Sequence, residues 1–228
     1  MATCIVYKLG MVEYGEAYRI QRRLRNKKIN GKLADVLLIL EHPPTFTIGK
    51  SGKLENILVS NAQLRRKGIT LFCTGRGGDV TYHGPGQLIA YPIVSLKRMG
   101  KDLHYYVHAL EEVVIRTLKD FRLCAHRDES HAGVWAGKEE VAAIGISIRK
   151  WITMHGIALN VNPNLEHFSC INPCGFSDRQ ATSVSKLLGY PVSMERVINR
   201  FISHFSDVFE TRTVLRLLPE LRTRPKTT

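Results

Sequence analysis

Cys174 lies between a proline and a glycine in the run 172–176, and this placement could expose its thiol at a sharp turn. A thiolate is a good nucleophile, but a positive neighbour or a base must hold the thiol in its ionised form. The candidates elsewhere in the chain are Lys138, His83 and His155. On spacing alone, a single cysteine is more often a small buried hydrophobic residue.

A glycine-rich segment from Arg76 to Gln87 is the second feature that could bind a ligand. Glycine lets the backbone approach a ligand closely and direct N–H groups toward it, as in sites for anions and acyl groups. The spacing of a phosphate-binding P-loop is absent. A glycine-rich hairpin turn is the structural alternative, although such turns need only about two to five residues.

Two histidines and a cysteine pair could also act as ligands or bases. His42 and His155 lie at the ends of expected strands, where functional groups often collect, but either could equally be a hydrogen-bonded core histidine. Cys170 and Cys174 resemble half of a zinc site, yet no second close pair of cysteines or histidines completes four ligands. The sequence therefore predicts no metal.

The elements that must position these residues alternate between strands and helices. Apolar residues at spacings of three and four indicate a main core helix from Leu103 to Phe121. Short apolar runs bounded by turn residues indicate strands at 36–40, 45–49, 69–73, 88–94, 134–136, 141–148 and 154–161. Further helices are expected at 9–26, 61–67, 183–188 and 194–209, and the segment 76–87 is expected to be a loop.

Length and composition fit one large globular domain. A chain of 228 residues can bury a sizeable core without disulfides, and 44% apolar with 23% charged residues is close to the globular average. We expect a single domain over 1–228 with a frayed tail at 222–228. A small helical subdomain from about residue 178 onward is the alternative.

The charge, the cysteine content and the absence of targeting segments indicate the cellular compartment and the kind of partner that we expect. The N-terminus lacks a secretory signal, no apolar run approaches the roughly 18 to 20 residues of a membrane span, and five scattered cysteines favour reduced thiols. We expect a soluble cytoplasmic protein. The net charge of +13 favours an acidic partner, whereas no helix-turn-helix, zinc-finger or RNP-like motif supports nucleic acid. A solvated basic surface is the alternative.

Six motifs, taken in order, resemble the lipoyl(octanoyl) transferase family. They are Glu41-His42-Pro43-Pro44 with Thr47-Ile48-Gly49, Arg76-Gly77-Gly78 running to His83-Gly84-Pro85-Gly86-Gln87, Gly133-Val134-Trp135, Ala142-Ala143-Ile144-Gly145, His155-Gly156-Ile157-Ala158-Leu159-Asn160 and Pro173-Cys174-Gly175. The resemblance covers about residues 7–188. It implies an α/β (α+β) fold related to the biotin and lipoate protein ligases, class II synthetase-like, with a mixed sheet flanked by helices in a single domain.

The resemblance also implies an acyltransferase without ATP, metal or other cofactor. Such an enzyme moves octanoyl, or lipoyl, from acyl carrier protein to a lysine on lipoyl domains of 2-oxo acid dehydrogenases or on the glycine cleavage H protein, with no membrane or nucleic-acid partner. Cys174 would be acylated by the donor and then displaced by the lysine. The acyl site would comprise Arg76, Gly77, Gly78, Asp79, Val80, Thr81, Tyr82, His83, Ala143, Ile144, Gly145, Gly156, Ile157 and Ala158, supported by His42 and His155.

One position departs from the family pattern. Directly before the Val141–Gly145 stretch the family has a lysine that lowers the pKa of the cysteine, and here Glu140 stands in its place, where it would oppose thiolate formation. Lys138 would face the same side if 138–142 were a strand, displaced by about 6 to 7 Å. Alternatively, Glu140 acts as a general base with His83 or His155, or the chemistry is altered or impaired. We favour the last hypothesis because distance and charge sign both weigh against Lys138.

Two other functions fit parts of the pattern. An ATP-dependent lipoate ligase would share the fold, but it uses a lysine for the phosphate, and Cys174 in its Pro-Cys-Gly setting argues against it. A catalytically deficient homologue that binds carrier proteins, lipoyl domains or nucleic acid would explain Glu140. ATP-dependent attachment of free lipoate would identify the ligase, and binding of a partner without acyl transfer would identify the deficient homologue.

Overall fold

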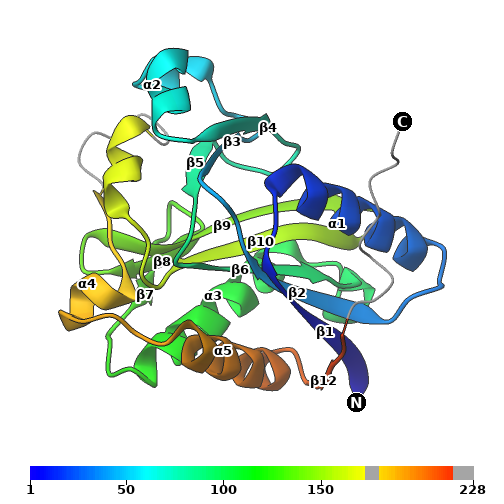
Figure 1. The fold of residues 1–228 in the computed structure, drawn as a ribbon. Helices are drawn as coiled ribbons and strands as arrows, with labels where there is room; N and C mark the ends of the chain where they lie inside the picture. The colour runs from blue at the N-terminus through cyan, green and yellow to red at the C-terminus, as the bar shows by residue number, and fades with distance from the viewer. Residues whose placement is uncertain (173–179, 218–228) are drawn as a thin grey trace.

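The computed structural model describes residues 1–172 and 180–217, and these form a mixed β-sheet with helices on both faces (Figure 1). The elements in chain order are β1 (Ala2–Met11), α1 (Tyr14–Ile29), β2 (Asp35–Glu41), β3 (Thr45–Ile48), η1 (Leu54–Asn56), α2 (Asn61–Arg66), β4 (Thr70–Cys73), β5 (Val80–His83), β6 (Gln87–Ile93), η2 (Leu96–Met99), α3 (Leu103–Lys119), β7 (His126–Arg127), β8 (Gly133–Ala136), β9 (Glu139–Arg149), β10 (Ile152–Asn160), η3 (Leu165–Cys170), β11 (Gln180–Ala181), α4 (Val184–Leu188), α5 (Met194–Val208) and β12 (Thr211–Leu215).

The main sheet has the order β12-β1-β2-β6-β10-β9-β8-β7, with β11 paired to the start of β9. Every residue of β6 and β10 is buried because helices cover the sheet on both sides. A second, smaller sheet has the order β4-β3-β5 and lies above the main one in Figure 1. The mixed sheet flanked by helices agrees with the predicted fold class.

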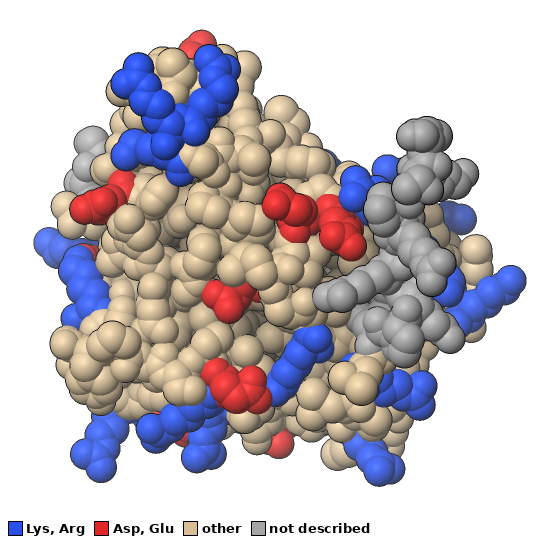
Figure 2. Space-filling view, in the orientation of Figure 1, with Lys and Arg blue, Asp and Glu red and all other residues tan. Residues whose placement is uncertain are grey.

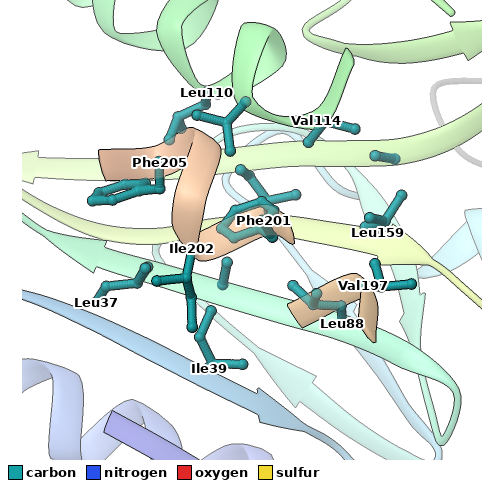
Figure 3. Packing of buried hydrophobic residues seen from close by; sticks show 14 of the residues in the cluster. Leu37, Ile39, Leu88, Leu110, Val114, Leu159, Val197, Phe201, Ile202 and Phe205 are labelled. Atoms are coloured by element: carbon teal, nitrogen blue, oxygen red, sulfur yellow. The ribbon is translucent and has the colours of Figure 1, made fainter. Parts of the chain in front are cut away.

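Helices α3 and α5 cover one face of the main sheet and form the larger core. Phe201 and Phe205 of α5 are fully buried and meet Leu110 of α3 and Leu37 of β2 in one apolar cluster (Figure 3). Apolar residues at helical spacing predicted both helices, and the side chain of Asp102 caps the start of α3. Because α5 packs into this core and β12 pairs with β1, the described residues from 180 to 217 share the main core.

Helix α1 covers the opposite face, and its start differs from the prediction. The expected helix 9–26 begins only at Tyr14 and continues to Ile29, because residues up to Met11 belong to β1 and pair with β2. Ala17, Ile20 and Leu24 lie on the buried side of the helix. They pack against β2 and β6, which fixes α1 over the centre of the sheet.

The segment 76–87 is not the continuous loop that its glycines predicted. Val80–His83 forms strand β5, which pairs antiparallel with β3 through Thr45 and His83 at one end and Ile48 and Val80 at the other. Val80 and Tyr82 are buried in a third apolar cluster beneath α2 and η3. Their alternation with the half-buried Thr81 is the strand pattern that the neighbouring glycines concealed.

No helix within residues 1–172 and 180–217 combines the length and apolar character that a membrane span requires.

Candidate functional site

A cavity of about 1070 Å³ lies between the segment 76–83 and strands β9 and β10. This volume is at the upper end of ordinary ligand pockets, which hold roughly 300 to 1,000 Å³, and could accept a fatty chain together with its connecting groups. The walls include most residues that the sequence singled out: Arg76, Gly77, Gly78, Asp79, Val80, Thr81, His83, Glu140, Ala143, Ile144, Gly145, His155, Gly156, Ile157 and Ala158. Their function stays a prediction.

Pairs of small residues on β9 and β10 hollow out the sheet wall of this cavity. The antiparallel register places Ala143 opposite Ala158 and Gly145 opposite Gly156. Larger side chains at the two alanines, which line the cavity, would reduce its volume. A Cβ on Gly145 would lie 3.1 Å from Cδ of Arg76, so the glycine at this position allows the side chain of Arg76 to pack closely against β9.

Arg76 is almost fully buried and holds the loop 76–79 against β3. Its Nη2 donates to the backbone oxygens of Thr47 at 2.7 Å and Asp79 at 2.6 Å, and its Nε donates to Oγ1 of Thr47 at 3.2 Å. Gly77 N donates to Ile146 O at 2.8 Å, which ties the same loop to β9. The loop that Arg76 holds therefore connects the two sheets at the cavity.

The backbone of β10 is irregular where it meets the cavity. His155 has a φ of +63°, which is uncommon for a residue with a side chain, and its N–H donates to Oε1 of Gln21 on α1 at 2.8 Å. The neighbouring strand carries Pro92, which has no N–H to offer. A Cβ on Gly156 would lie 2.3 Å from Ala90 O, so only glycine fits here. The distortion turns His155 toward the cavity wall.

Three buried histidines surround the inner part of the cavity. His83 and His155 line it, and their Nε2 atoms lie 3.4 Å from Oγ1 of Thr47 and of Thr74, respectively. His42 lies behind the lining, where Nε2 is 2.9 Å from Oη of Tyr91 and Nδ1 is 2.6 Å from Val12 O.

Burial keeps all three rings neutral near pH 7. It lowers the pKa of His42 to about 4 and that of His155 to about 3, with Arg76 and Arg25 lowering the latter further. Burial, with the neighbouring His42 and Arg76, lowers the pKa of His83 well below its usual value. These histidines can therefore exchange hydrogen bonds with a ligand at neutral pH but do not supply positive charge.

Besides His42, two predicted site residues lie outside the cavity. Tyr82 points to the other side of β5, where its ring stacks on His167 at 4.9 Å and packs against Phe46, because side chains alternate along a strand. Lys138 lies in the turn before β9 and is exposed, since the strand begins only at Glu139. The condition under which Lys138 would face the same side as residue 140, a strand over 138–142, is therefore not met.

The charged wall of the cavity is formed where β11 and α4 meet the start of β9. Glu140 lines the cavity and pairs in register with Ala181, while its backbone oxygen accepts from Thr182 N at 2.8 Å. Lys186 of α4 also lines the cavity, and its Nζ lies 2.6 Å from Oε1 of Glu139. An ammonium group thus pairs with Glu139 and belongs to the same cavity wall as Glu140.

With this geometry in place, similarity to known proteins decides the family. A family model described as the lipoyl protein ligase A/B catalytic domain matches residues 13–206. The chain belongs to this family. The match confirms the resemblance found in the sequence motifs.

Relatives within the lipoyl protein ligase A/B family are similar over nearly their whole length. The chain is 52% identical over 203 residues to a protein named Octanoyltransferase from Caldicellulosiruptor saccharolyticus, covering 88% of this chain and 86% of that protein. It is 47% identical over 206 residues to an Octanoyltransferase from Desulforamulus reducens, covering 90% of each.

Solved structures confirm the predicted fold. A lipoate-protein ligase A bound with ATP superposes with a TM-score of 0.79 at 18% identity, covering 97% of this chain and 91% of the other. A biotin protein ligase from Aquifex aeolicus gives a TM-score of 0.52 at 13% identity over 92% and 70% of the two chains. At these identities the likeness concerns the fold alone.

Cys174, the predicted nucleophile of this family member, lies outside the described residues. The residues that flank the undescribed segment are both placed: Asn172, whose N–H donates to Asn56 O at 2.8 Å, and Gln180 at the start of β11. Both line the cavity.

Sequence reasoning missed several residues of the site, among them three with polar side chains. Tyr14, Tyr91 and Lys186 line the cavity, and the ring of Tyr14 stacks on His83 at 5.6 Å. Tyr14 and Tyr91 resemble ordinary core residues in the sequence, and nothing local marks Lys186. Among the described residues, no group of three or more histidine, cysteine or acidic side chains is arranged to hold a metal ion.

Proposed function

We propose that this protein is a cytoplasmic octanoyltransferase. It takes octanoyl, or lipoyl, from acyl carrier protein and places it on a lysine of lipoyl domains, including those of 2-oxo acid dehydrogenases and the glycine cleavage H protein. The similarity to proteins named Octanoyltransferase over about 90% of the chain carries this proposal. The cavity supports it, because paired alanines and glycines leave room for an unbranched chain between β9, β10 and the loop 76–79.

Cys174 is the proposed nucleophile, and the reaction has two steps. The thiolate attacks the donor thioester, the carrier thiolate leaves and takes a proton, and the acyl group remains on Cys174. The neutral amine of the acceptor lysine then attacks the new thioester, the amide forms, and the Cys174 thiolate leaves while the amine loses a proton. The position of Asn172 and Gln180 on the cavity wall supports placing the cysteine between them at the same cavity.

Glu140 is proposed to alter the first step. Its carboxylate belongs to the cavity wall, and a negative charge near a thiol raises the thiol pKa and lowers the thiolate fraction. The exposed position of Lys138 leaves that residue without a role at the cavity. Glu140→Lys is therefore expected to raise the rate of octanoyl transfer.

Mass spectrometry of the intact protein after incubation with octanoyl-acyl carrier protein tests the proposal. An octanoyl mass increase on Cys174 is expected, and Cys174→Ala or Cys174→Ser removes it. Cys73→Ala is the matched control, because Cys73 is an exposed cysteine on β4 and its loss should leave the adduct intact. If Cys174 stays unmodified in both the natural sequence and Glu140→Lys, the nucleophile is assigned wrongly. ATP-dependent attachment of free lipoate would instead identify a ligase.

A further inference from the structure

A strongly basic surface borders the cavity on the side of α2. Residues 50–67 contain five lysines and arginines against one acidic residue, Glu55. All five cationic side chains are exposed, and none forms an ion pair with a described residue: Lys50, Lys53, Arg65, Arg66 and Lys67. Figure 2 shows lysine and arginine side chains gathered over α2 at the top of the view.

Two exposed leucines lie within this basic segment. Leu54 is 67% exposed and Leu58 is 60% exposed, although both belong to a residue type that is usually buried. Leu58 also lines the cavity, so the surface reaches the cavity rim. Apolar side chains surrounded by charges of one sign are typical of a surface that binds a partner of opposite charge. We call this surface, formed by the five cations with Leu54 and Leu58, the α2 rim.

We propose that the α2 rim docks the donor, an acidic protein that carries the acyl chain as a thioester. This inference rests on the proposed function and deepens it by assigning the donor to one surface. Unpaired cations attract an acidic protein over a distance of about a Debye length, roughly 8 Å at physiological salt. The exposed leucines then offer an apolar path from the partner to the cavity.

The charge of the reacting groups favours the donor over the acceptor at this surface. An acceptor must bring a lysine, whose ammonium the five cations repel. A thioester carries no positive charge and meets no such barrier. The carboxylate that lines the cavity, Glu140, lies at the start of β9 and not on α2, so the approaching ammonium has a separate favourable wall.

Helix α1 provides a second basic surface that differs in one respect. Arg19, Arg22 and Lys27 are exposed on α1, but none of them lines the cavity. A partner held there would have no direct path for its acyl group. These residues therefore supply a matched control with the same charge and a different position.

The test compares two triple variants that each remove three positive charges. One is Arg65→Gln with Arg66→Gln and Lys67→Gln on the α2 rim, and the other is Arg19→Gln with Arg22→Gln and Lys27→Gln on α1. Transfer to a lipoyl domain is measured over a range of donor concentrations, first with octanoyl-acyl carrier protein and then with octanoyl-pantetheine, a neutral small thioester. Circular dichroism and the unfolding midpoint establish that both variants fold.

The α2-rim variant should raise the KM for the carrier-bound donor by about tenfold and leave the KM for octanoyl-pantetheine unchanged. The α1 variant should change neither KM by more than about twofold. The dependence of kcat/KM on salt should also weaken only in the α2-rim variant. A parallel loss with octanoyl-pantetheine, an equal loss in the α1 variant, or a raised KM for the lipoyl domain alone would overturn the docking assignment. Absence of transfer by the unaltered protein with either donor would instead refute the proposed function.

Discussion

Acidification should destabilise this protein through histidines that are buried without a charge. His42 is fully buried and His155 is 1% exposed, and burial lowers their pKa values to about 4 and about 3. In the unfolded chain both rings bind a proton near pH 6.5. Their stabilising contribution is therefore fully present above pH 6.5 and is lost as the pH falls toward the folded-state values, because the unfolded state binds more protons.

The size of the effect follows from the shifts. Each pH unit between the unfolded and folded pKa values costs about 1.4 kcal/mol per histidine. From pH 6.5 to pH 5, which is about one and a half units, His42 and His155 each cost about 2 kcal/mol, or about 4 kcal/mol together. The lowered pKa of His83 acts in the same direction. A loss of this size is a large fraction of the roughly 5 to 15 kcal/mol that stabilises a typical domain.

Urea unfolding of the wild type and of His155→Asn at pH 7.5, 6.5 and 5 measures this contribution. Asparagine tolerates the positive φ of this position, so the variant should fold, although its stability at pH 7.5 falls. Its loss of stability between pH 6.5 and 5 should be smaller than that of the wild type by about 2 kcal/mol. His104→Asn, at an exposed histidine of α3, should keep the wild-type pH dependence. If His155→Asn also keeps it in full, the buried ring is not the proton acceptor on unfolding.

Three further changes test the walls and the core. Gly49→Ala would place a Cβ 2.1 Å from a backbone oxygen of the loop 76–79, so octanoyl transfer should fall by about 100-fold. Gly75→Ala is the control, because its Cβ meets nothing within 4 Å and the variant should retain activity. Equal transfer rates in the two variants would show that the position of the loop 76–79 is unimportant. Ala143→Leu should narrow the cavity and reduce transfer of octanoyl more than of butanoyl in competition assays, and an unchanged preference would place the chain elsewhere. Phe201→Ala should lower the free energy of unfolding by about 3 to 5 kcal/mol in urea titrations. Ser203→Ala, on the exposed side of α5, should change the free energy of unfolding by no more than about 0.5 kcal/mol. Similar values for the two variants would contradict the packing in Figure 3.

Elements with a strong local pattern could be predicted from the sequence. The periodic apolar residues of α3 and the apolar runs of β9 and β10 place these elements to within a few residues. The start of α1 was predicted too early because strand β1 runs directly into the helix with only two residues between them. Strand β5 was missed because the glycines around it have the composition of a loop, while its partner β3 is distant in the sequence.

The cavity could be predicted only in part for a related reason. Residues on β9, β10 and the segment 76–83 were found through motifs, since each motif is contiguous. Tyr14 and Lys186 reach the same cavity from helices at opposite ends of the chain, and only the packing of those helices brings them there. His42 is the opposite case, because it belongs to a sequence motif but does not line the cavity. Its Nε2 lies within hydrogen-bonding distance of Oη of Tyr91, behind the lining residues.

The electrostatic surroundings of residue 140 differ between what the sequence suggests and what the fold places nearby. Along the chain, the resemblance implies a lysine where Glu140 stands, and the region would then lack an ammonium group. In the fold, Lys186 places an ammonium 2.6 Å from Oε1 of Glu139, the residue before Glu140 in the chain, and Lys186 and Glu140 both line the cavity. The charged groups of residues 139, 140 and 186 are therefore two carboxylates and one ammonium, which act on their surroundings according to distance. Glu140→Lys converts these groups to one carboxylate and two ammonium groups. The expected gain in transfer rate therefore reflects a change of net charge from −1 to +1 across Glu139, residue 140 and Lys186, added to an ammonium that the site already has.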